Sequence, residues 1–455
     1  MEFINSVIYF IITIAILVLV HEFGHFIAAK ISKMRVDAFA IGFGQRLFGF
    51  NKKTGFTFGS LPKDLDLEGD TDYRVCLLPF GGYVKVAGMI DESMDKDFLQ
   101  KAPQPWEFRS KSTGKKLFVL FAGVLMNLIL AFIIFWTINY TKPVQHLKTT
   151  TIGYISPKSS LILAGLKTGD RIVSINGHPV KYWDEVLNHI FVKRIGEEFT
   201  LTLERNNEII NLQLDSKLLQ IDKKDGITFL PREVKVLVND VIPNSPAEEV
   251  GLARNDTILL VNGIEIISSN QLVDLIKENT SNSISLVVKR GNDTLTFQVT
   301  PSSEGKIGIF SAMVFYAPIE IEKFNLIQAG VKAFQNCYEN TLLFFTIIGK
   351  VVTGKVEFSQ AFGGPIRIAQ MAAQTADINF LSFINFIALL SLSLAIINIL
   401  PFPVLDGGHI IIVLLEGIIR REISPKVKIV IQNIGFIILL LFMAFVIYSD
   451  IMNFK

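Results

Sequence analysis

The sequence has almost no excess of charge of either sign. Its 44 Lys and Arg residues nearly balance 42 Asp and Glu residues, so the formal net charge is +2, which excludes nucleic-acid binding on charge grounds. Basic residues are also missing before the first apolar run, which begins at Phe3 and is followed by no small-residue cleavage site. These absences argue against a cleaved signal peptide and favour a retained helix.

The chain instead contains long uncharged runs, and half of its 455 residues are hydrophobic. A helix needs about 20 apolar residues to cross the hydrocarbon core of a bilayer. Four runs meet this length: Phe3 to Val20, Leu117 to Tyr140, Phe380 to Val404 and Ile429 to Tyr448. We therefore predict a polytopic α-helical membrane protein with four transmembrane helices, within residues 1–30, 117–140, 378–419 and 429–448.

Basic residues near the ends of the spans give the orientation, because they gather on the cytoplasmic side. They occur after the first span, before the second and in the connection 420–428, which places residues 31–116 in the cytoplasm and the N-terminus and residues 141 to about 375 outside. We expect the amphipathic segment 324–352 to lie flat on the outer surface. Cys76 and Cys337 then lie on opposite sides, as free thiols.

The outer segment contains an internal repeat. The stretch GLKTGDRIVSINGHPV, from Gly165, aligns with GLARNDTILLVNGIEI, from Gly251, at an offset of 86 residues. Each copy has an Asn-Gly turn, a helix and a hairpin pattern. The pattern resembles a bacterial PDZ domain in residues 145–222 and again in 223–303. Such domains bind extended peptides at a sheet edge, although these two could also only exclude bulky proteins.

The motif HEFGH at the end of the first span predicts a metal site. His21 and His25 are four residues apart and so share one helix face, with Glu22 beside them. Zinc held by three protein ligands keeps a fourth position for water, whose proton Glu22 could accept. The alternative is a set of polar residues packed between helices, but ionisable groups at membrane depth are costly and usually functional.

A third ligand must come from the same depth of another helix. Asp406 follows about 25 apolar residues of an inward-running helix and so reaches the depth of His21, while His409 is a rival further inward. Pro401 and Pro403 should break this helix and admit water. Asn398 could bind a peptide carbonyl or its oxyanion, or else join two helices.

HEFGH, the late motif NILPFPVLDGGH and the outer tandem repeats together resemble the site-2 protease family of intramembrane zinc metalloproteases. The resemblance covers nearly the whole chain. It implies one zinc ion bound by His21, His25 and Asp406, Glu22 as the catalytic base, and Asn398 as a substrate-binding residue. The proline-containing break at Pro401 and Pro403 would also contact substrate.

Two further stretches match this family. DYRVCLLPFGGYVKVAG, from Asp72, resembles its membrane-reentrant β-structure, which would hold unwound substrate through Gly81, Gly82 and Tyr83, unless it is only a cytoplasmic hairpin. GGPIRIAQ, from Gly363, resembles the segment before the third span, and suggests no chemical role. The sequence departs from the family at Val124, where a proline is usual, and in a long polar insert at residues 45–70.

The resemblance implies hydrolysis of peptide bonds within transmembrane segments of single-pass membrane proteins in a bacterial inner membrane. An anti-sigma factor after a first cut, or a remnant signal peptide, would be the substrate, and peptide C-termini could bind the PDZ domains. Two rival functions would not require Glu22: a catalytically silent PDZ scaffold, and a metal transporter, since charged groups within the membrane also mark ion paths.

Overall fold

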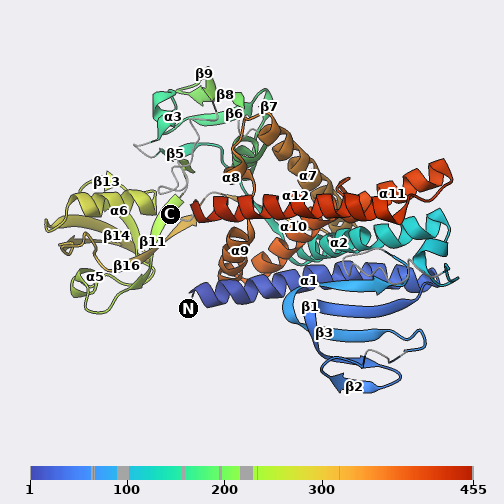
Figure 1. The fold of residues 1–455 in the computed structure, drawn as a ribbon. Coiled ribbons are helices and arrows are strands. Elements are labelled where there is room, and N and C mark those ends of the chain that lie inside the picture. Colours follow the sequence, from blue (N-terminus) through green and yellow to red (C-terminus); the bar gives the residue numbers. More distant parts are fainter. Residues whose placement is uncertain are drawn as a thin grey trace. The chain divides into compact units, whose positions relative to one another are not determined.

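The computed structural model describes residues 2–62, 65, 67–89, 102–155, 159–193, 197–215, 229–232, 234–316 and 318–452. The chain divides into two compact units (Figure 1). Unit 1 combines residues 1–142 with residues 324–455, and unit 2 comprises residues 143–323. Segments from both ends of the sequence therefore build unit 1, and each unit is described separately below.

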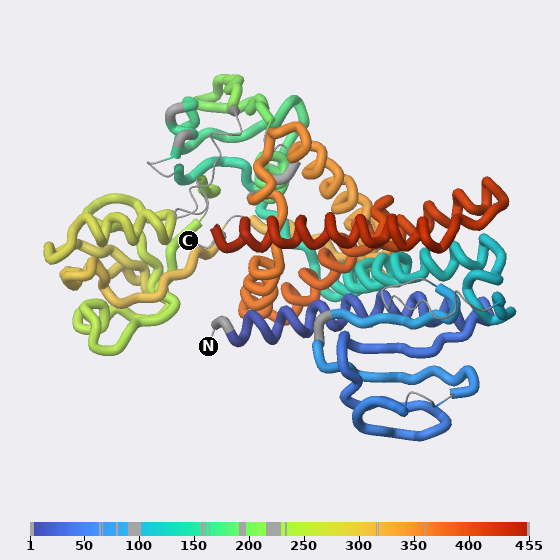
Figure 2. Tube along the Cα trace, viewed as in Figure 1, coloured from blue at the N-terminus to red at the C-terminus, as the bar shows by residue number. Residues whose placement is uncertain are grey.

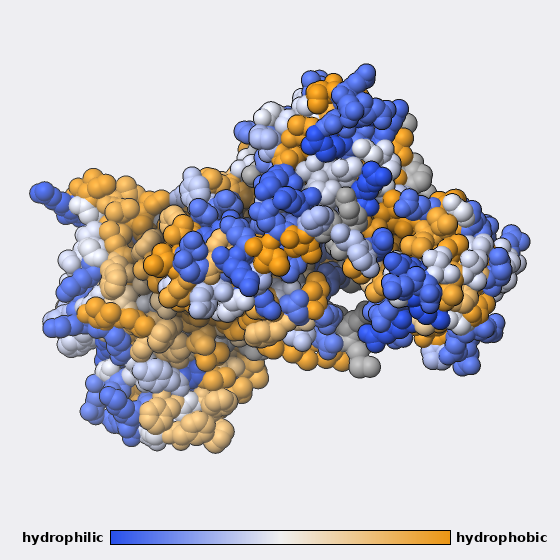
Figure 3. Space-filling model, turned by 180° about the vertical axis from the view of Figure 1, so that it is seen from behind, coloured by the Kyte–Doolittle hydropathy of each residue, from blue (hydrophilic) through white to orange (hydrophobic). Residues whose placement is uncertain are grey.

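The described part of unit 1 contains four helices that are long and apolar enough to cross a membrane: α1 (Glu2–Ile31), α2 (Thr113–Thr141), α10 (Phe380–Ile399) and α12 (Pro425–Met452). Helix α2 packs against both α1 and α10. Helix α12 exposes large apolar side chains along its length, including Ile437, Leu441 and Phe445. Hydrophobic residues accordingly cover much of unit 1 in Figure 3, as expected for a surface that faces lipid.

The helices α7 (Leu326–Val352), α8 (Phe358–Ala361) and α9 (Pro365–Ile378) pack beside these candidate spans. Small side chains of α7, Ala333 and Cys337, are buried in a cluster with residues of α2 and α10. The opposite side of α7 exposes Ile327, Val331 and Phe334. The orientation of this helix along the membrane surface stays a prediction. The cysteines Cys76 and Cys337 are both free thiols.

The segment between α1 and α2 forms a sheet of β1 (Val36–Asn51), β2 (Gly55–Phe58) and β3 (Asp72–Val86), visible as the blue strands in Figure 2. Strands β1 and β3 both bend, so Ile41 pairs with Val75 on one side and with Gly82 on the other. Residues 82–86 thus pair with β1 on one side only, and among the described residues they form one edge of the sheet. A short 3₁₀ helix, Phe108–Ser110, leads into α2.

The polar insert at residues 45–70 extends this sheet instead of forming only a loop. It supplies the end of β1 and all of β2, which pair from Phe48 with Phe58 to Asn51 with Gly55. Arg46 fixes the insert, since its guanidinium donates to both oxygens of buried Asp72 at 3.1 Å and to the Gly59 carbonyl oxygen at 2.6 Å. A bidentate pair of this kind is strong and directional.

The third apolar run is divided into two helices. Helix α10 ends at Ile399, and α11 (Asp406–Ile419) begins after a turn that contains Pro401 and Pro403. Two glycines allow the chain to fold back on itself. A Cβ atom would lie 2.2 Å from the Leu400 carbonyl oxygen at Gly407, and 2.2 Å from the Phe402 carbonyl oxygen at Gly408. Asp406 is thereby held at the first turn of α11.

Unit 2 contains two similar halves. The first has β5 (Ile152–Ile155), α3 (Ser160–Leu163), β6 (Arg171–Ile175), β7 (His178–Pro179), α4 (Trp183–Leu187) with a π-helical turn Asn188–Lys193, β8 (Glu198–Arg205), β9 (Glu208–Asp215) and β10 (Phe229–Pro231). The second has β11 (Val234–Val241), α5 (Pro246–Glu249), β12 (Thr257–Val261), β13 (Ile264–Glu265), α6 (Ser269–Glu278), β14 (Ile284–Arg290), β15 (Asp293–Val299) and β16 (Ile309–Phe315). Strands β4 (Val144–Leu147) and β17 (Ile319–Glu322) pair with each other.

The repeat in the sequence has a structural counterpart in unit 2. Buried Asp170 accepts hydrogen bonds from Arg205 at 2.6 and 2.8 Å, and buried Asp256 accepts the same pair from Arg290 at 2.7 Å. Each arginine also donates to the carbonyl oxygen of the aligned glycine, Gly165 or Gly251. The two copies therefore make equivalent contacts, with the arginines 85 residues apart and the aspartates and glycines 86 apart, and each half has its own apolar core.

Described strands extend each half beyond its predicted C-terminal end. The predicted boundary between residues 222 and 223 lies outside the described residues. Phe229 belongs to the core of the first half, and β10 pairs with β5, so the first half continues to Pro231. The second half continues past residue 303, because β16 pairs with β11. Strands contributed from distant sequence positions cannot be assigned from local periodicity alone.

Candidate metal centre and active site

Two histidines of α1 and the first residue of α11 meet inside unit 1. His21 and His25 lie one turn apart, and their Nε2 atoms are 3.2 Å from each other. Asp406 reaches both rings, with Oδ2 3.1 Å from His21 Nε2 and Oδ1 3.4 Å from His25 Nε2. The ligand atoms of all three residues lie within 4.8 Å of one another. The α10–α11 break thus brings a carboxylate to the histidine pair.

This cluster fits a tetrahedral metal ion. With bonds of about 2.0 to 2.1 Å, neighbouring ligand atoms of a tetrahedral zinc ion are about 3.3 Å apart. The three separations between 3.1 and 3.4 Å match this value. Asp406 Oδ2 is buried and, despite its proximity to His21, has no hydrogen bond of acceptable geometry within the described part of the chain. A cation would satisfy both this oxygen and the two facing imidazole nitrogens.

The other nitrogen of each ring is held by α2. His25 Nδ1 lies 2.8 Å from the carbonyl oxygen of Val119, which fixes the proton on Nδ1 and leaves Nε2 free to bind metal. His21 Nδ1 lies 3.2 Å from the side-chain nitrogen of Asn127. The Oδ1 atom of Asn127 is buried without a partner among the described residues, and turning the amide by 180° lets it accept the His21 Nδ1 proton.

Two glycines allow α1 and α2 to approach closely enough for these contacts. A Cβ atom on Gly24 would lie 2.3 Å from the carbonyl oxygen of Ala122. On Gly123 it would lie 2.4 Å from His25 Nε2 and 2.8 Å from His21 Cε1. Gly123 therefore provides the space that both imidazole rings occupy.

Glu22 lines the same cavity as the three candidate ligands. The cavity has a volume of about 60 Å³, and its wall includes Tyr83, Val84 and Val86 of the β3 edge. The predicted base and the predicted substrate-binding edge therefore face one space.

Of the other residues predicted from the sequence, one lies close to the three candidate ligands, and the rest shape the backbone around them. Asn398 reaches the centre, with Nδ2 3.5 Å from His21 Nε2. Pro401 and Pro403 form the helix break and do not line the cavity. Gly82 permits close strand pairing, because a Cβ atom there would lie 2.6 Å from the Ala40 carbonyl oxygen, and Gly81 has a φ of +95°.

His409, the rival ligand, lines the cavity but stands outside the three-residue cluster. Its Nε2 atom lies 3.2 Å from the side-chain nitrogen of Gln432.

Sequence reasoning gave no role to Gly123, Asn127 or the Val119 carbonyl. One signal was present, since an asparagine within an apolar spanning helix must find a polar partner. The partner itself depends on how α1 and α2 pack, and both helices are apolar on every side, so neither sequence shows which faces meet.

Comparison with known proteins agrees with this geometry. A model of Peptidase family M50 matches residues 9–442. The Regulator of sigma E protease of Haemophilus influenzae is 30% identical over 471 residues, which cover 100% of both chains. The Regulator of sigma-E protease RseP of Escherichia coli K12 is 30% identical over 97% of both chains, and the Protease RseP of Yersinia pestis is 29% identical over 99% of both. The chain belongs to peptidase family M50.

Proposed function

We propose that this protein is an intramembrane zinc metalloprotease in which His21, His25 and Asp406 hold one zinc ion. The convergence of these three side chains supports the proposal most directly, because ligand atoms from α1 and α11 meet at tetrahedral spacing in a unit with four candidate spanning helices. Membership of a peptidase family supports peptide-bond hydrolysis as the reaction.

The side chains around the cavity have separate tasks in this mechanism. The zinc ion that His21, His25 and Asp406 would hold would supply Lewis-acid chemistry, making water more acidic and polarising the peptide carbonyl. Glu22 accepts a proton from the attacking water and later delivers it to the leaving amine. Asn398, close to His21, donates its amide hydrogen to the carbonyl oxygen on which negative charge develops. The Val119 carbonyl and Asn127 keep the two imidazoles in position.

Cleavage also requires an extended substrate, because a transmembrane helix hides its peptide groups in its own hydrogen bonds. Residues 82–86 at the edge of β3 offer backbone groups to a substrate strand, and Tyr83, Val84 and Val86 of this edge already face the cavity. Gly81 and Gly82 keep the edge close to β1. The substrate would therefore bind as an added strand that passes the metal.

We further propose that the substrates are single-pass proteins of a bacterial inner membrane, with an anti-sigma factor and remnant signal peptides as the classes. The names of the relatives, which refer to regulation of sigma E, support the first class. The two halves of unit 2 would be extracytoplasmic PDZ domains that exclude bulky outer domains or bind peptide C-termini. Residues 31–116 would be cytoplasmic and their sheet membrane-reentrant.

The test uses the purified full-length protein in detergent and a tagged single-pass substrate that lacks its outer domain. Wild-type protein should release a fragment cut within the membrane segment, and Glu22→Gln or a zinc chelator should abolish the cut. Absence of cleavage by zinc-loaded wild-type protein on several such substrates would contradict the proposal. Metal flux into liposomes without cleavage would then favour a transporter.

A further inference from the structure

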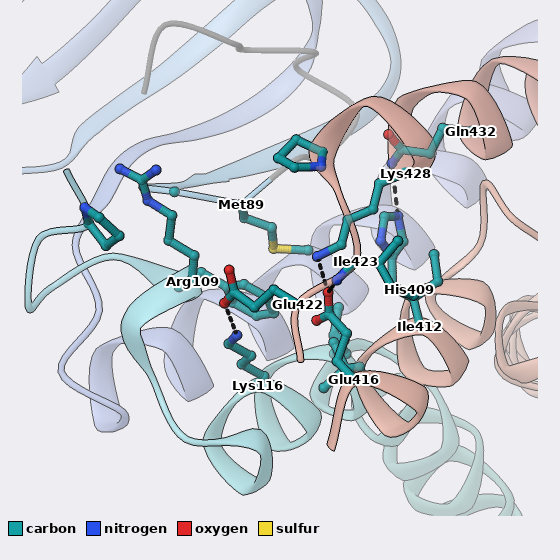
Figure 4. A pocket seen from close by; sticks show the side chains of 16 residues that line it. Met89, Arg109, Lys116, His409, Ile412, Glu416, Glu422, Ile423, Lys428 and Gln432 are labelled. Atoms are coloured by element: carbon teal, nitrogen blue, oxygen red, sulfur yellow. Dashed lines mark hydrogen bonds and ion pairs between the residues drawn. The ribbon is translucent and has the colours of Figure 1, made fainter. Parts of the chain in front are cut away.

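A second cavity of unit 1 adjoins the cavity that His21, His25 and Asp406 line, which is called the metal cavity below. It has a volume of about 150 Å³ and lies between the segment after β3, the start of α2, helix α11 and the start of α12 (Figure 4). Met89 and His409 line both cavities. Since the β3 edge at Tyr83 to Val86 faces the metal cavity and Met89 follows three residues later, the direction of the edge strand leads from the first cavity into the second.

Two of the three cations in the wall of this second cavity have close carboxylate partners. Lys428 Nζ lies 2.6 Å from Glu416, which is buried and also accepts a hydrogen bond from the Ile423 nitrogen. The Nε atom of Arg109 lies 2.5 Å from Oε2 of Glu107. Both charges are therefore compensated without a ligand.

Lys116 differs from these two cations. Its side chain is only 10% exposed, yet its nearest carboxylate among the described residues, Glu422, is 3.4 Å away on a side chain that is 64% exposed (Figure 4). The Phe108 ring lies 5.8 Å from the Lys116 ammonium and can stabilise it only weakly. Glu422 is a hydrogen-bonded partner, but because its side chain is largely solvated this pair is weak, and a carboxylate that enters the cavity can replace Glu422. Lys116 is thus placed to bind a carboxylate that enters the cavity.

The remaining wall shows what kind of molecule would bring this carboxylate. It is largely apolar, with Met89, Phe108, Leu120 and Ile412 among its residues, which suits the backbone and side chains of an extended peptide. A peptide already paired with the β3 edge would enter without a change of direction. A free anion would leave these apolar walls uncovered.

We propose that the second cavity binds the substrate segment next to the scissile bond on the cytoplasmic side, and that Lys116 selects an acidic residue there. The proposal rests on the proteolytic function argued above. Because the chain passes from Val86 in the first cavity to Met89, which lines both, in three residues, the acidic residue should lie only a few residues from the scissile bond. Lys116 is then a specificity-determining residue, separate from the groups around the metal.

The test places Glu, Gln or Lys, one position at a time, at the second to sixth residue on the cytoplasmic side of the cut in an otherwise constant substrate. For the wild-type enzyme, kcat/KM should be about tenfold higher with Glu than with Gln at one of these positions, the effect of one hydrogen bond to a charged group. Lys116→Gln should remove the preference, and Lys116→Glu should reverse it in favour of Lys.

The matched control is Lys115→Glu, which makes the same charge change at the neighbouring exposed position, outside the cavity. It should leave the preference for Glu unchanged. Equal cleavage of the Glu and Gln substrates by wild-type enzyme at all five positions would overturn the proposal, and this comparison needs no variant to fold. Retention of the preference in Lys116→Glu would also overturn it.

Two other results would overturn it in distinguishable ways. In one of them, the cleavage rate does not depend on the charge of the substrate but increases when phosphatidylglycerol replaces phosphatidylcholine in proteoliposomes. This result would assign the cavity to a lipid phosphate. If zinc-loaded enzyme cuts none of the substrates, including the Gln reference, the proteolytic function itself fails and the inference fails with it.

Discussion

A Cβ atom at Gly123 of α2 would lie 2.4 Å from Nε2 of His25 on α1. The position of the candidate metal centre therefore depends on the absence of a side chain on a helix that supplies no candidate ligand. Because displacement of catalytic groups by about 1 Å can lower a rate a hundredfold, this glycine should be as important as a ligand.

We expect Gly123→Ala to lower kcat/KM by at least about tenfold, because the added methyl group pushes the imidazoles out of position. Gly114→Ala on the same helix is the control, since a Cβ atom there meets nothing within 4 Å. Steady-state cleavage of a tagged substrate measures both. Full activity of Gly123→Ala would show that α1 and α2 are further apart than described.

Asn127 should tune metal affinity through His21. Replacing it with Ala removes the partner of His21 Nδ1 and should weaken zinc binding by about 10- to 100-fold, the usual effect of losing a group that orients a ligand. Titration against a competing chelator measures the affinity. Asn139→Ala is the control, because Asn139 is also buried on α2 but its side-chain nitrogen has no partner among the described residues. Equal affinity in both variants would rule out this role.

The convergence of His21, His25 and Asp406 could be predicted from the sequence, and the packing around them could not. The spacing of His21 and His25 places them on one helix face, and the topology places Asp406 at their depth. The contacts of Gly123 and Asn127 depend on the register between two helices that are apolar all round, which periodicity does not encode. The insert at residues 45–70 reads as a polar loop in the sequence. In the structure it contributes the end of β1 and the short strand Gly55–Phe58 to the sheet.

Arg46 illustrates this limitation, since its partner Asp72 is 26 residues away in sequence. Arg46→Met leaves the buried Asp72 carboxylate with Arg74 as its remaining partner and should destabilise the sheet by about 2–3 kcal/mol. Lys53→Met breaks the more exposed pair with Glu68 and should cost about 0–1 kcal/mol. Hydrogen exchange of the β3 amides measures the stability of the sheet in the two variants. Equal protection of these amides in Arg46→Met and Lys53→Met would contradict the predicted difference.

His146 should make the pairing of β4 with β17 depend on pH. Burial lowers the pKa of His146, but the carboxylates of Asp184 and Glu322 outweigh this effect and raise it above 6.5. A raised pKa in the folded state means that the ion pairs stabilise the fold fully below about pH 6.5 and are lost as the pH rises through the higher folded value.

Hydrogen exchange of β4 and β17 in the full-length protein, corrected for the intrinsic effect of pH, should therefore be slower at pH 5.5 than at pH 8.5. His146→Gln should abolish the difference, because glutamine does not titrate. A pH dependence that persists in this variant would assign it to other groups.

Zinc content tests the central claim most directly. Protein purified without added metal should contain one zinc ion per chain, and Glu22→Gln should keep this ion while losing peptide cleavage. Asp406→Ala, which removes one candidate ligand, should lose both. If Asp406→Ala retained a full equivalent of zinc, or if the wild-type protein cut its substrate with no metal bound, the proposed centre would be wrong.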